Sequence, residues 1–441
     1  MLQRHFQLKE NNTNVKTEIL AGLTTFSTMA YILVVNPFIL SKAGMDFNAV
    51  IVSTALASAI GTLLMAFYAK LPVALAPGMG LNAFFAYTIV IGMGYTWQFA
   101  LTAVFLEGIL FIILSLLNIR EAIINSIPIH LKYAISAGIG LFIALIGLVN
   151  AGIIETGMHH IGNDQIEGVI VKLGKMQSSS VLIVFAGLLI SAVLMFKKVK
   201  AALLIGILIS TIIGIPFGLA HLPANNQLIS LPPSPAPVFG KLEFSKIFSW
   251  DMLTILFTLL MVNLFDTVGT LIGCCSAGGM LDKDGKIPNA KRALLSDAVA
   301  TTSAAVLGTS VVTAYVESVS GIASGGRTGL TSLTVALMFL LSLFFAPLFG
   351  MIPAFATSPA LIIVGLLMVS DAKHIDFSDI TNSLPAFLTI VMMPFTYSIA
   401  EGIVFGVTSY VLLKLMSGRY REISPAMYII AALLSISFWV R

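Results

Sequence analysis

The chain has 441 residues, of which 58% are hydrophobic and 10% are charged, and its mean hydropathy is +0.99. Soluble domains carry charge on about a quarter of their residues, so this composition excludes a soluble domain and predicts a polytopic membrane protein. The net charge of +4 says little about partners, and we expect a lipid bilayer and no nucleic acid.

Seven apolar stretches precede residue 221. A helix needs about 20 residues to cross the hydrocarbon core of a bilayer, and many of these stretches are that long. Glycine and proline interrupt the third one, within VALAPGMGLNAFFAYT (73–88). The predicted spans are residues 19–40, 48–68, a broken element at 73–92, 98–117, 131–151, 181–196 and 201–220.

Basic residues gather in alternate loops. Lys16 precedes the first span, Lys70 follows the second, and Lys198 separates the sixth from the seventh. The positive-inside rule places such loops in the cytoplasm. We therefore expect residues 1–18 to be a cytoplasmic N-terminus and the chain to cross the plasma or inner membrane many times.

A polar connection over residues 221–250 divides the chain into two halves. Its prolines, in LPPSPAP (231–237), exclude a helix there, and we expect it to be a linker on the outside. The tail at 418–441 is apolar, and the sequence leaves open whether it crosses the membrane. The predicted spans of the second half are residues 251–273, 290–307, a broken element at 310–326, 330–345, 356–369, 384–398 and 402–416.

The third position of each half holds an interrupted segment. Seven spans per half is an odd number, so the second half must be inverted relative to the first. Paired interruptions of this kind point to the central binding site of a transporter. We predict an all-α polytopic membrane protein of about 14 transmembrane spans, built as two inverted seven-span repeats over residues 19–220 and 251–417.

An acidic residue stands at the second interruption, SVVTAYVESVSGIASGGRTGL (310–330). The β-branched residues before it favour an extended strand, and Ser318 suits the start of a short helix. Glu317 falls at the junction. An ionisable side chain at membrane depth is by default a substrate or proton site.

Two more polar groups complete the candidate site. Asn82 follows the glycines Gly78 and Gly80 in the first interruption. Asp266 lies fifteen residues into the span that begins at residue 251, or roughly 20 Å at about 1.5 Å per residue. Thr267 and Thr270 lie beside it, and we expect both threonines and the glycines to support the site.

One amide and two carboxyls suit a planar, neutral heterocycle that offers both N–H donors and ring acceptors. The N-termini of two half-helices would add backbone N–H groups. A carboxyl that changes protonation as substrate enters or leaves is what proton symport requires, so we assign proton coupling to Asp266 and Glu317. We expect no metal and no cofactor other than the coupling proton.

Other interpretations remain open for several of these residues. Asn82 could join helices, and Glu107 could make a structural hydrogen bond or lie on a proton path. Asp297 and Glu401 lie nearer span ends, where solvation at the interface or a basic neighbour explains them. An anion carrier or channel of the same general fold is the main rival function, although two carboxylates would repel an anion. No HExxH motif or nucleophile elbow predicts an enzyme.

Four motifs resemble those of the azaguanine-resistance-type purine permeases. These permeases are a branch of the nucleobase–cation symporters, a superfamily that also includes the xanthine and uracil permeases. They are GLTTFSTMAYILVVNP (22–37), APGMGLNAFFAYT (76–88), NLFDTVGT (263–270) and VESVSGIASGGRTGLTS (316–332). The resemblance implies proton-coupled uptake of adenine, guanine or hypoxanthine, with xanthine or uracil as the alternative substrates. It places Asn82, Asp266 and Glu317 in the binding site and matches Tyr315 to a binding-site tyrosine of uracil carriers.

The same resemblance implies a division into two domains that move against each other like an elevator. The core would comprise residues 19–118 and 251–346, and the gate residues 131–220 and 356–417. Spans 3 and 10 would each contain a short β-strand and a half-helix. The resemblance also implies a homodimer.

Overall fold

Helices make up most of the computed structural model, which describes residues 2–117, 128–161, 165–221, 229–281 and 287–440. The elements before residue 221 are α1 (Leu2–His5), α2 (Val15–Met29), α3 (Ile32–Lys42), α4 (Phe47–Leu64), the π-helix η1 (Met65–Ala69), β1 (Leu75–Pro77), α5 (Met79–Ala83), the π-helix η2 (Phe84–Gly92), α6 (Trp97–Leu116), α8 (Ile129–Asn150), β2 (Ile154–Ile161), β3 (Gln165–Leu173), α9 (Ser179–Phe196) and α10 (Ala202–Gly214).

In the second half, long helices flank one short strand. Its helices and strand are α11 (Trp250–Ala277), α12 (Ala290–Leu307), β4 (Val312–Ala314), α13 (Ser318–Ala323), α14 (Gly329–Ser342), α15 (Ala346–Gly350), α16 (Ala354–Val369), α17 (Ile380–Phe395), α18 (Ile399–Met416) and α19 (Pro425–Val440). Short 3-10 turns, η4 (Leu343–Phe345), η5 (Ser370–His374) and η6 (Tyr420–Glu422), follow α14, α16 and α18.

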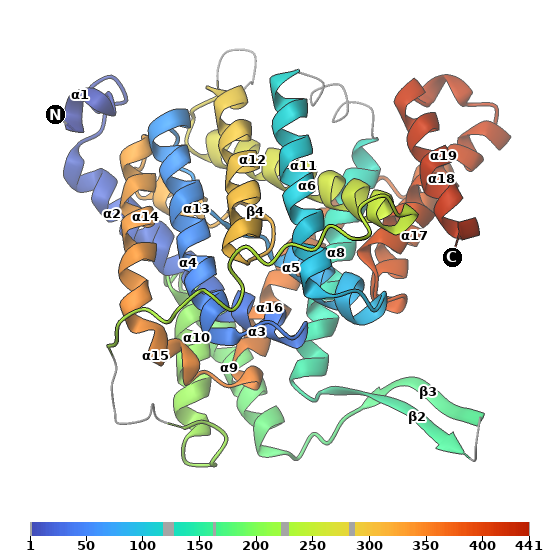
Figure 1. Ribbon diagram of the computed structural model, residues 1–441, viewed down its shortest axis with the longest axis horizontal. Coiled ribbons are helices and arrows are strands. Elements are labelled where there is room, and N and C mark those ends of the chain that lie inside the picture. Colours follow the sequence, from blue (N-terminus) through green and yellow to red (C-terminus); the bar gives the residue numbers. More distant parts are fainter. Residues whose placement is uncertain (1, 118–127, 162–164, 222–228, 282–286, 441) are drawn as a thin grey trace.

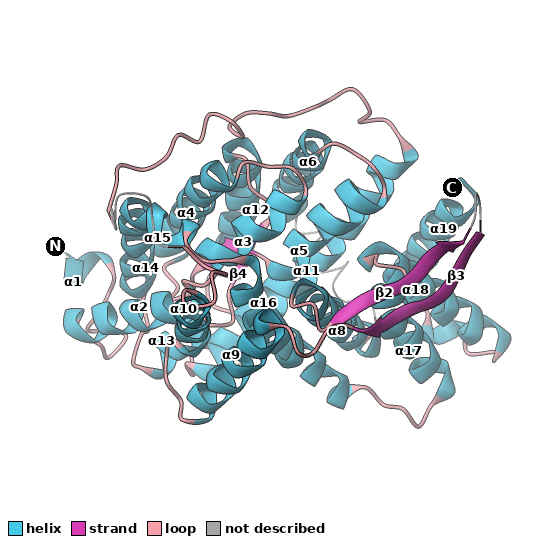
Figure 2. Cartoon of the chain, turned by 90° about the horizontal axis from the view of Figure 1, so that it is seen from below, coloured by secondary structure: helices cyan, strands magenta, loops and turns pink. Residues whose placement is uncertain are grey.

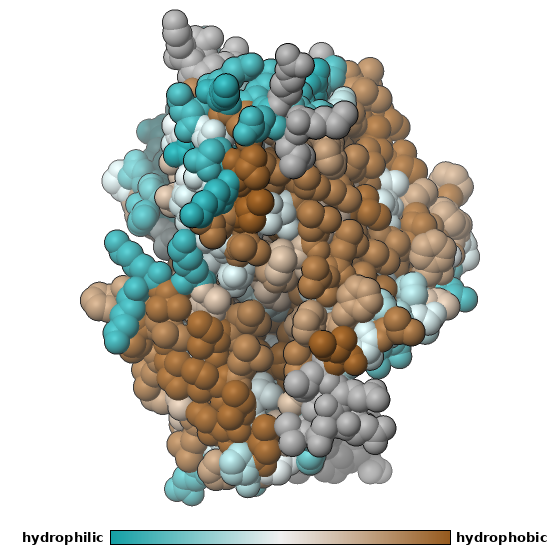
Figure 3. Space-filling model, turned by 90° about the vertical axis from the view of Figure 1, so that its left-hand side faces the viewer, coloured by the Kyte–Doolittle hydropathy of each residue, from teal (hydrophilic) through white to brown (hydrophobic). Residues whose placement is uncertain are grey.

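The predicted membrane spans are confirmed as helical elements. Within the described residues, nine helical stretches are long and apolar enough to cross a bilayer. The other five predicted spans fall on the shorter apolar helices at Met79–Gly92, Ala202–Gly214 and Ile380–Phe395, on the more polar α12, and on β4 with α13. Hydrophobic residues cover much of the face seen in Figure 3, as a lipid-facing surface requires.

A pair of three-residue strands lies in the interior of the bundle. Strand β1 pairs with β4 in antiparallel register, with Ala76 opposite Thr313. All six strand residues are buried. Each strand leads almost directly into a half-helix, β1 into α5 and η2, and β4 into α13. The predicted strand and half-helix in spans 3 and 10 are therefore confirmed.

The long helices pack in two groups, and the strand pair lies against the first group and α11. In the first, α2 packs against α14, α4 against α12 and α14, and α6 against α12. In the second, α8 packs against α16 and α17, α9 against α10 and α16, and α17 against α18. Figure 2 shows the helices of both groups in one body, seen from below.

The first predicted span is not one continuous helix. The break between α2 and α3 falls at Ala30 and Tyr31, where the amide of Leu33 donates to Ala30 O (3.1 Å) and that of Val34 to Tyr31 O (3.1 Å). These i to i+3 bonds tighten the turn. The break places Tyr31 beside the central strands.

The strands β2 and β3 form an antiparallel pair that extends beyond the helices in Figure 1. One further expectation needs correction. The span expected to end at residue 220 ends as a helix at Gly214, because Pro216 provides no amide hydrogen. The tail forms α19, which packs against α18 and α11.

The described part of the linker is extended over the first group of helices. The amide of Ser230 donates to Phe344 O (3.0 Å), and that of Gly240 donates to Val306 O (2.7 Å). Val238 is fully buried. Figure 1 shows this segment crossing in front of α12 and α6, so these bonds attach the linker to that group.

A buried carboxylate holds α2 to the start of α14. Glu18 is fully buried, and it accepts from the amides of Arg327 (2.9 Å), Thr328 (3.3 Å) and Thr331 (3.2 Å) and from the Thr331 hydroxyl (2.6 Å). The first amides of a helix lack partners within the helix and favour a negative charge. Glu18 therefore caps α14 from a different helix.

Replacing Glu18 with alanine should destabilise the folded protein by roughly 3 kcal/mol, because several buried donors would lose their acceptor at about 1–3 kcal/mol each. This loss is measured as a fall in the melting temperature of the protein in detergent. Size-exclusion chromatography of a fluorescent fusion monitors the melting. Glu10 is exposed, so Glu10→Ala is the matched control. Equal melting temperatures for the two variants would contradict the capping role.

Candidate functional site

The strand pair holds the residues that follow it by backbone and side-chain hydrogen bonds. The amide of Tyr315 donates to Ala74 O (3.0 Å), and its hydroxyl donates to Pro77 O (2.6 Å). Ser318, which follows Glu317, accepts from the amide of Ala74 (3.0 Å). Tyr315 is thus fixed across the strands, and Ser318 anchors the start of α13.

Glu317 lies at the junction between β4 and α13, as predicted. Its carboxylate is half-buried and accepts from the hydroxyl of Tyr31 (2.6 Å). The backbone carbonyl of Glu317 accepts from the Ser320 hydroxyl (2.7 Å) and from the Ser320 amide (3.0 Å). Tyr31 comes from the break between α2 and α3, so that break supplies a direct partner for the carboxylate.

Asp266 reaches the same region from α11. Its carboxylate lies near Thr313 of β4 and close enough to Glu317 for their charges to interact. Gly78 explains how these elements approach so closely, since a Cβ there would lie 2.7 Å from Thr313 Cγ2 and 3.7 Å from Asp266 Oδ2. The structure therefore brings together both predicted carboxylates and Tyr315.

Asn82 lies on α5, just after β1, and is fully buried. Its Oδ1 accepts a short hydrogen bond from the hydroxyl of Ser310. Its Nδ2 has no hydrogen-bond partner among the described residues. A buried amide with an unused donor costs free energy, and a bound ligand with an acceptor would remove that cost.

Gly80 and Thr270 were both expected to support the candidate site. A Cβ at Gly80 would lie 2.5 Å from Ile139 Cγ2, so this glycine allows α5 to lie close to α8. Thr270 is half-buried one turn beyond Asp266. Gly80 thus marks a close contact between a half-helix and the second group of helices.

Open space lies along α11 beyond Asp266. Gly269 and Gly273 are exposed, and a Cβ at either would meet no described atom within 4 Å. Val316, beside Glu317, is 56% exposed although Tyr315 before it is 5% exposed. The junction of β4 and α13 and the C-terminal half of α11 therefore both have accessible surface.

Thr267 belongs to a separate buried cluster behind Asp266. Its hydroxyl lies 3.0 Å from Asp297 Oδ1, 3.2 Å from Asn263 Oδ1 and 2.8 Å from the Thr313 hydroxyl. Asp297 is fully buried, so solvation at a span end does not explain it. The acid lies in the middle of α12, where that helix faces α11.

Sequence reasoning missed Tyr31, Ser310 and Thr313 as partners of the site. Tyr31 was inside the AYILVVNP motif, and Ser310 and Thr313 lie within the interrupted segment that carries Glu317. One signal was available for Thr313. It lies four residues before Glu317, on a strand expected to face the site.

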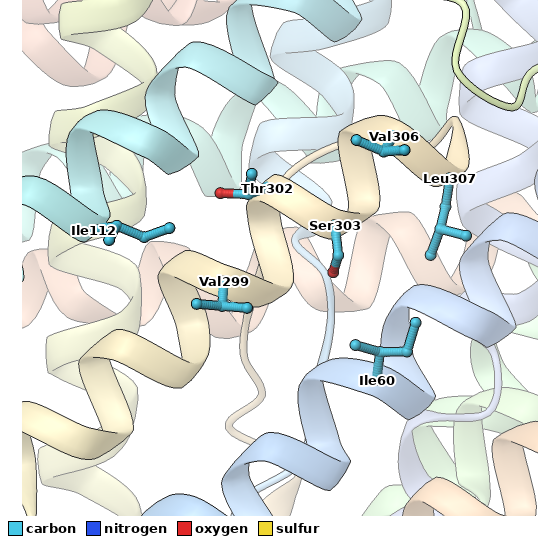
Figure 4. A pocket seen from close by; sticks show the side chains of 7 residues that line it. All are labelled: Ile60, Ile112, Val299, Thr302, Ser303, Val306 and Leu307. Atoms are coloured by element: carbon cyan, nitrogen blue, oxygen red, sulfur yellow. The ribbon is translucent and has the colours of Figure 1, made fainter.

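A surface groove of about 380 Å³ lies between α4, α6 and α12 (Figure 4). Its wall is mainly aliphatic, with Ile60, Ile112 and Val299 among its residues. None of the predicted site residues lines it, and it has no charged group to recognise a polar substrate. Within the described residues, no group of three His, Cys, Asp or Glu side chains is placed to hold a metal.

Comparisons with known proteins give close relatives over almost the whole chain. The xanthine/uracil permease model, described as Permease family, matches residues 16–405. The adenine permease AdeP of Escherichia coli is 44% identical over 433 residues, covering 98% of this chain and 95% of AdeP. The guanine/hypoxanthine permease PbuO of Bacillus subtilis is 45% identical over 442 residues, covering 99% and 100% of the two chains.

The fold also has a solved counterpart. The transmembrane domain of the cyanobacterial bicarbonate transporter BicA superposes with a TM-score of 0.65 at 18% identity, covering 89% of this chain and 97% of that domain. At this identity the likeness shows the fold alone. The motifs, the fold and the full-length relatives agree, and the chain belongs to the permease family that contains the adenine and guanine/hypoxanthine permeases, as a membrane transporter and not an enzyme.

Proposed function

We propose that the protein imports a purine nucleobase, hypoxanthine, guanine or adenine, by proton symport across the plasma or inner membrane. The unused Nδ2 donor of Asn82, buried at the start of the half-helix that follows β1, is the observation that carries this proposal. Asp266 and Glu317 supply acceptors beside the paired strand. A purine offers N–H donors and ring acceptors around one plane, which such a set can satisfy. The names of AdeP and PbuO support the same substrate class.

Proton coupling follows from two acids that share one site. Asp266 and Glu317 interact electrostatically, and Tyr31 donates to Glu317. When one carboxyl gains a proton, both the charge of the site and its set of donors change. Proton binding and substrate binding are then linked, each altering the affinity for the other.

Movement would occur between the two groups of helices. The helices of the predicted core (19–118 and 251–346) pack with one another, as do those of the predicted gate (131–220 and 356–417). The carboxylates belong to the core, and the accessible surface along α11 leads away from them. An elevator-like shift of the core would expose the site on alternate sides, with residues 1–18 in the cytoplasm and the protein as a homodimer.

A different substrate on the same fold is the alternative. BicA transports bicarbonate, and xanthine and uracil are the other substrates named for this family's model. Two carboxylates at the site disfavour a permanent anion through electrostatic repulsion. AdeP and PbuO are almost equally similar to this chain, so overall identity does not choose between adenine and the oxopurines.

Cells that lack their own nucleobase carriers should accumulate at least one of hypoxanthine, guanine and adenine when they express this protein. A protonophore should abolish the accumulation because it removes the driving force. Uptake of radiolabelled hypoxanthine, guanine, adenine, xanthine, uracil and bicarbonate, with and without protonophore, measures this. Transport of xanthine, uracil or bicarbonate alone would reject the purine assignment, and uptake that ignores the protonophore would reject proton symport.

Asp266→Asn and Glu317→Gln should each reduce accumulation by roughly tenfold or more, since a hydrogen bond to a charged group contributes about 1.5–3 kcal/mol and the coupling group is lost. The initial rate of uptake per amount of membrane protein measures the effect. Asp46→Asn is the control, because asparagine retains the helix-capping acceptor that Asp46 provides to Ala49. Normal accumulation by either site variant would remove that carboxyl from the coupling mechanism.

Asn82→Ala should raise KM by about tenfold through the loss of one hydrogen bond to the substrate, with a changed preference among purines. Competition between unlabelled purines and the labelled substrate measures both effects. Asn36 is a buried amide whose Nδ2 donates to Thr54 (2.7 Å) and Thr309 (2.9 Å), so Asn36→Ala should leave preference unchanged. An unchanged KM and an unchanged preference for all the purines tested would remove Asn82 from the site.

A further inference from the structure

A fully buried carboxylate on α6 lies at the far end of the polar cluster behind Asp266. Glu107 Oε1 accepts from Asn263 Nδ2 (3.1 Å), and Asn263 Oδ1 lies 3.2 Å from the Thr267 hydroxyl. Thr267 in turn lies 2.8 Å from the Thr313 hydroxyl. Glu107, Asn263 and Thr267 are 0% exposed.

Thr313 joins this cluster to the candidate site. Its hydroxyl lies 2.8 Å from the Thr267 hydroxyl, and the Asp266 carboxylate is a neighbour as well, since a Cβ on Gly78 would lie 2.7 Å from Thr313 Cγ2 and 3.7 Å from Asp266 Oδ2. A hydroxyl has a single proton to donate. The Thr313 proton therefore points either to Thr267 or to Asp266, and the choice depends on what the rest of the cluster offers.

Glu107 sets the direction of the hydrogen bonds in this chain. A carboxylate oxygen that accepts from an amide fixes which end of Asn263 faces α6, because only Nδ2 can donate. The Oδ1 end of Asn263 then faces Thr267 and shares its single proton with Asp297 Oδ1 (3.0 Å). With its proton directed away from the site, the Thr267 oxygen is left as an acceptor for Thr313.

We propose that Glu107 is a positioning residue for the substrate site, which acts through Asn263, Thr267 and Thr313 on the carboxylate of Asp266. The Thr313 hydroxyl can then donate to Asp266 when that carboxyl is ionised and turn to Thr267 when substrate or a proton satisfies it. Without the Glu107 acceptor, the side-chain amide of Asn263 can rotate so that Nδ2 faces Thr267. The Thr313 hydroxyl then loses the Thr267 oxygen as its alternative acceptor. The proposal rests on the proposed role of Asp266 in substrate binding.

The test compares Glu107→Leu, Glu107→Gln and Thr102→Val in the same cells and as purified protein. Thr102 is also fully buried on α6, and its hydroxyl accepts from the amide of Glu243 (2.7 Å). Thr102→Val thus removes a buried hydrogen bond from the same helix, but one that contacts the linker. Glu107→Gln keeps an oxygen acceptor for Asn263 Nδ2.

Glu107→Leu should raise both KM and the Kd of the purified protein for the transported purine by about fivefold, the equivalent of one ordinary hydrogen bond. Glu107→Gln should stay within about twofold of the wild type, and Thr102→Val should lower protein amount or Vmax while KM is unchanged. If Glu107→Leu does not fold, Thr267→Val takes its place with the same expected rise. Wild-type KM and Kd in the leucine variant, or in Thr267→Val, would overturn the proposal. So would a glutamine variant as impaired as the leucine variant.

The wild-type protein separates this inference from the proposed function. Absence of purine uptake and binding by folded wild-type protein rejects the function, and with it the role given to Glu107. Normal wild-type uptake together with an unchanged KM in Glu107→Leu rejects the positioning role alone.

Discussion

The pairing of β1 with β4 is the interaction on which the rest of the structure depends. A backbone that leaves the helical conformation inside a bilayer must find other partners for its amides and carbonyls, since lipid provides none. Each three-residue strand provides them for the other, with Leu75 opposite Ala314 and Pro77 opposite Val312. Their antiparallel register allows two half-helices to begin at the same place, and the candidate residues Asn82 and Glu317 lie at or near those helix starts.

The polar side chains around this pair divide into two sets that share Thr313. Tyr31, Glu317 and Asp266 lie beside accessible surface, whereas Glu107, Asn263 and Asp297 are fully enclosed. Enclosed polar groups are expensive unless their hydrogen bonds are satisfied, and satisfied networks hold one arrangement firmly. A rigid set behind the site and an open set in front of it suit a carrier that must bind and release a small polar molecule.

The fold is shared by proteins whose names give different substrates. BicA shares the fold at 18% identity, while AdeP and PbuO, whose names give different purines, are 44% and 45% identical to this chain. The shared fold therefore does not by itself identify the substrate. In this chain the candidate groups are one amide with an unused donor and two carboxyls.

The sequence alone determined the membrane setting, the approximate spans and both interrupted segments. Charge, glycine and proline are costly within apolar helices, so Asp266, Glu317 and the PGMG turn stand out without any structure. Only the tertiary structure decided the partners. Nothing in the sequence distinguishes Tyr31, Ser310, Thr313 or Asn263 from other polar residues of the chain. Each is part of the site or its surroundings because it contacts a residue distant in the sequence, as Tyr31 contacts Glu317. The sequence also did not show that Asp297 is enclosed or that β2 and β3 pair, because burial and pairing depend on which elements meet in space.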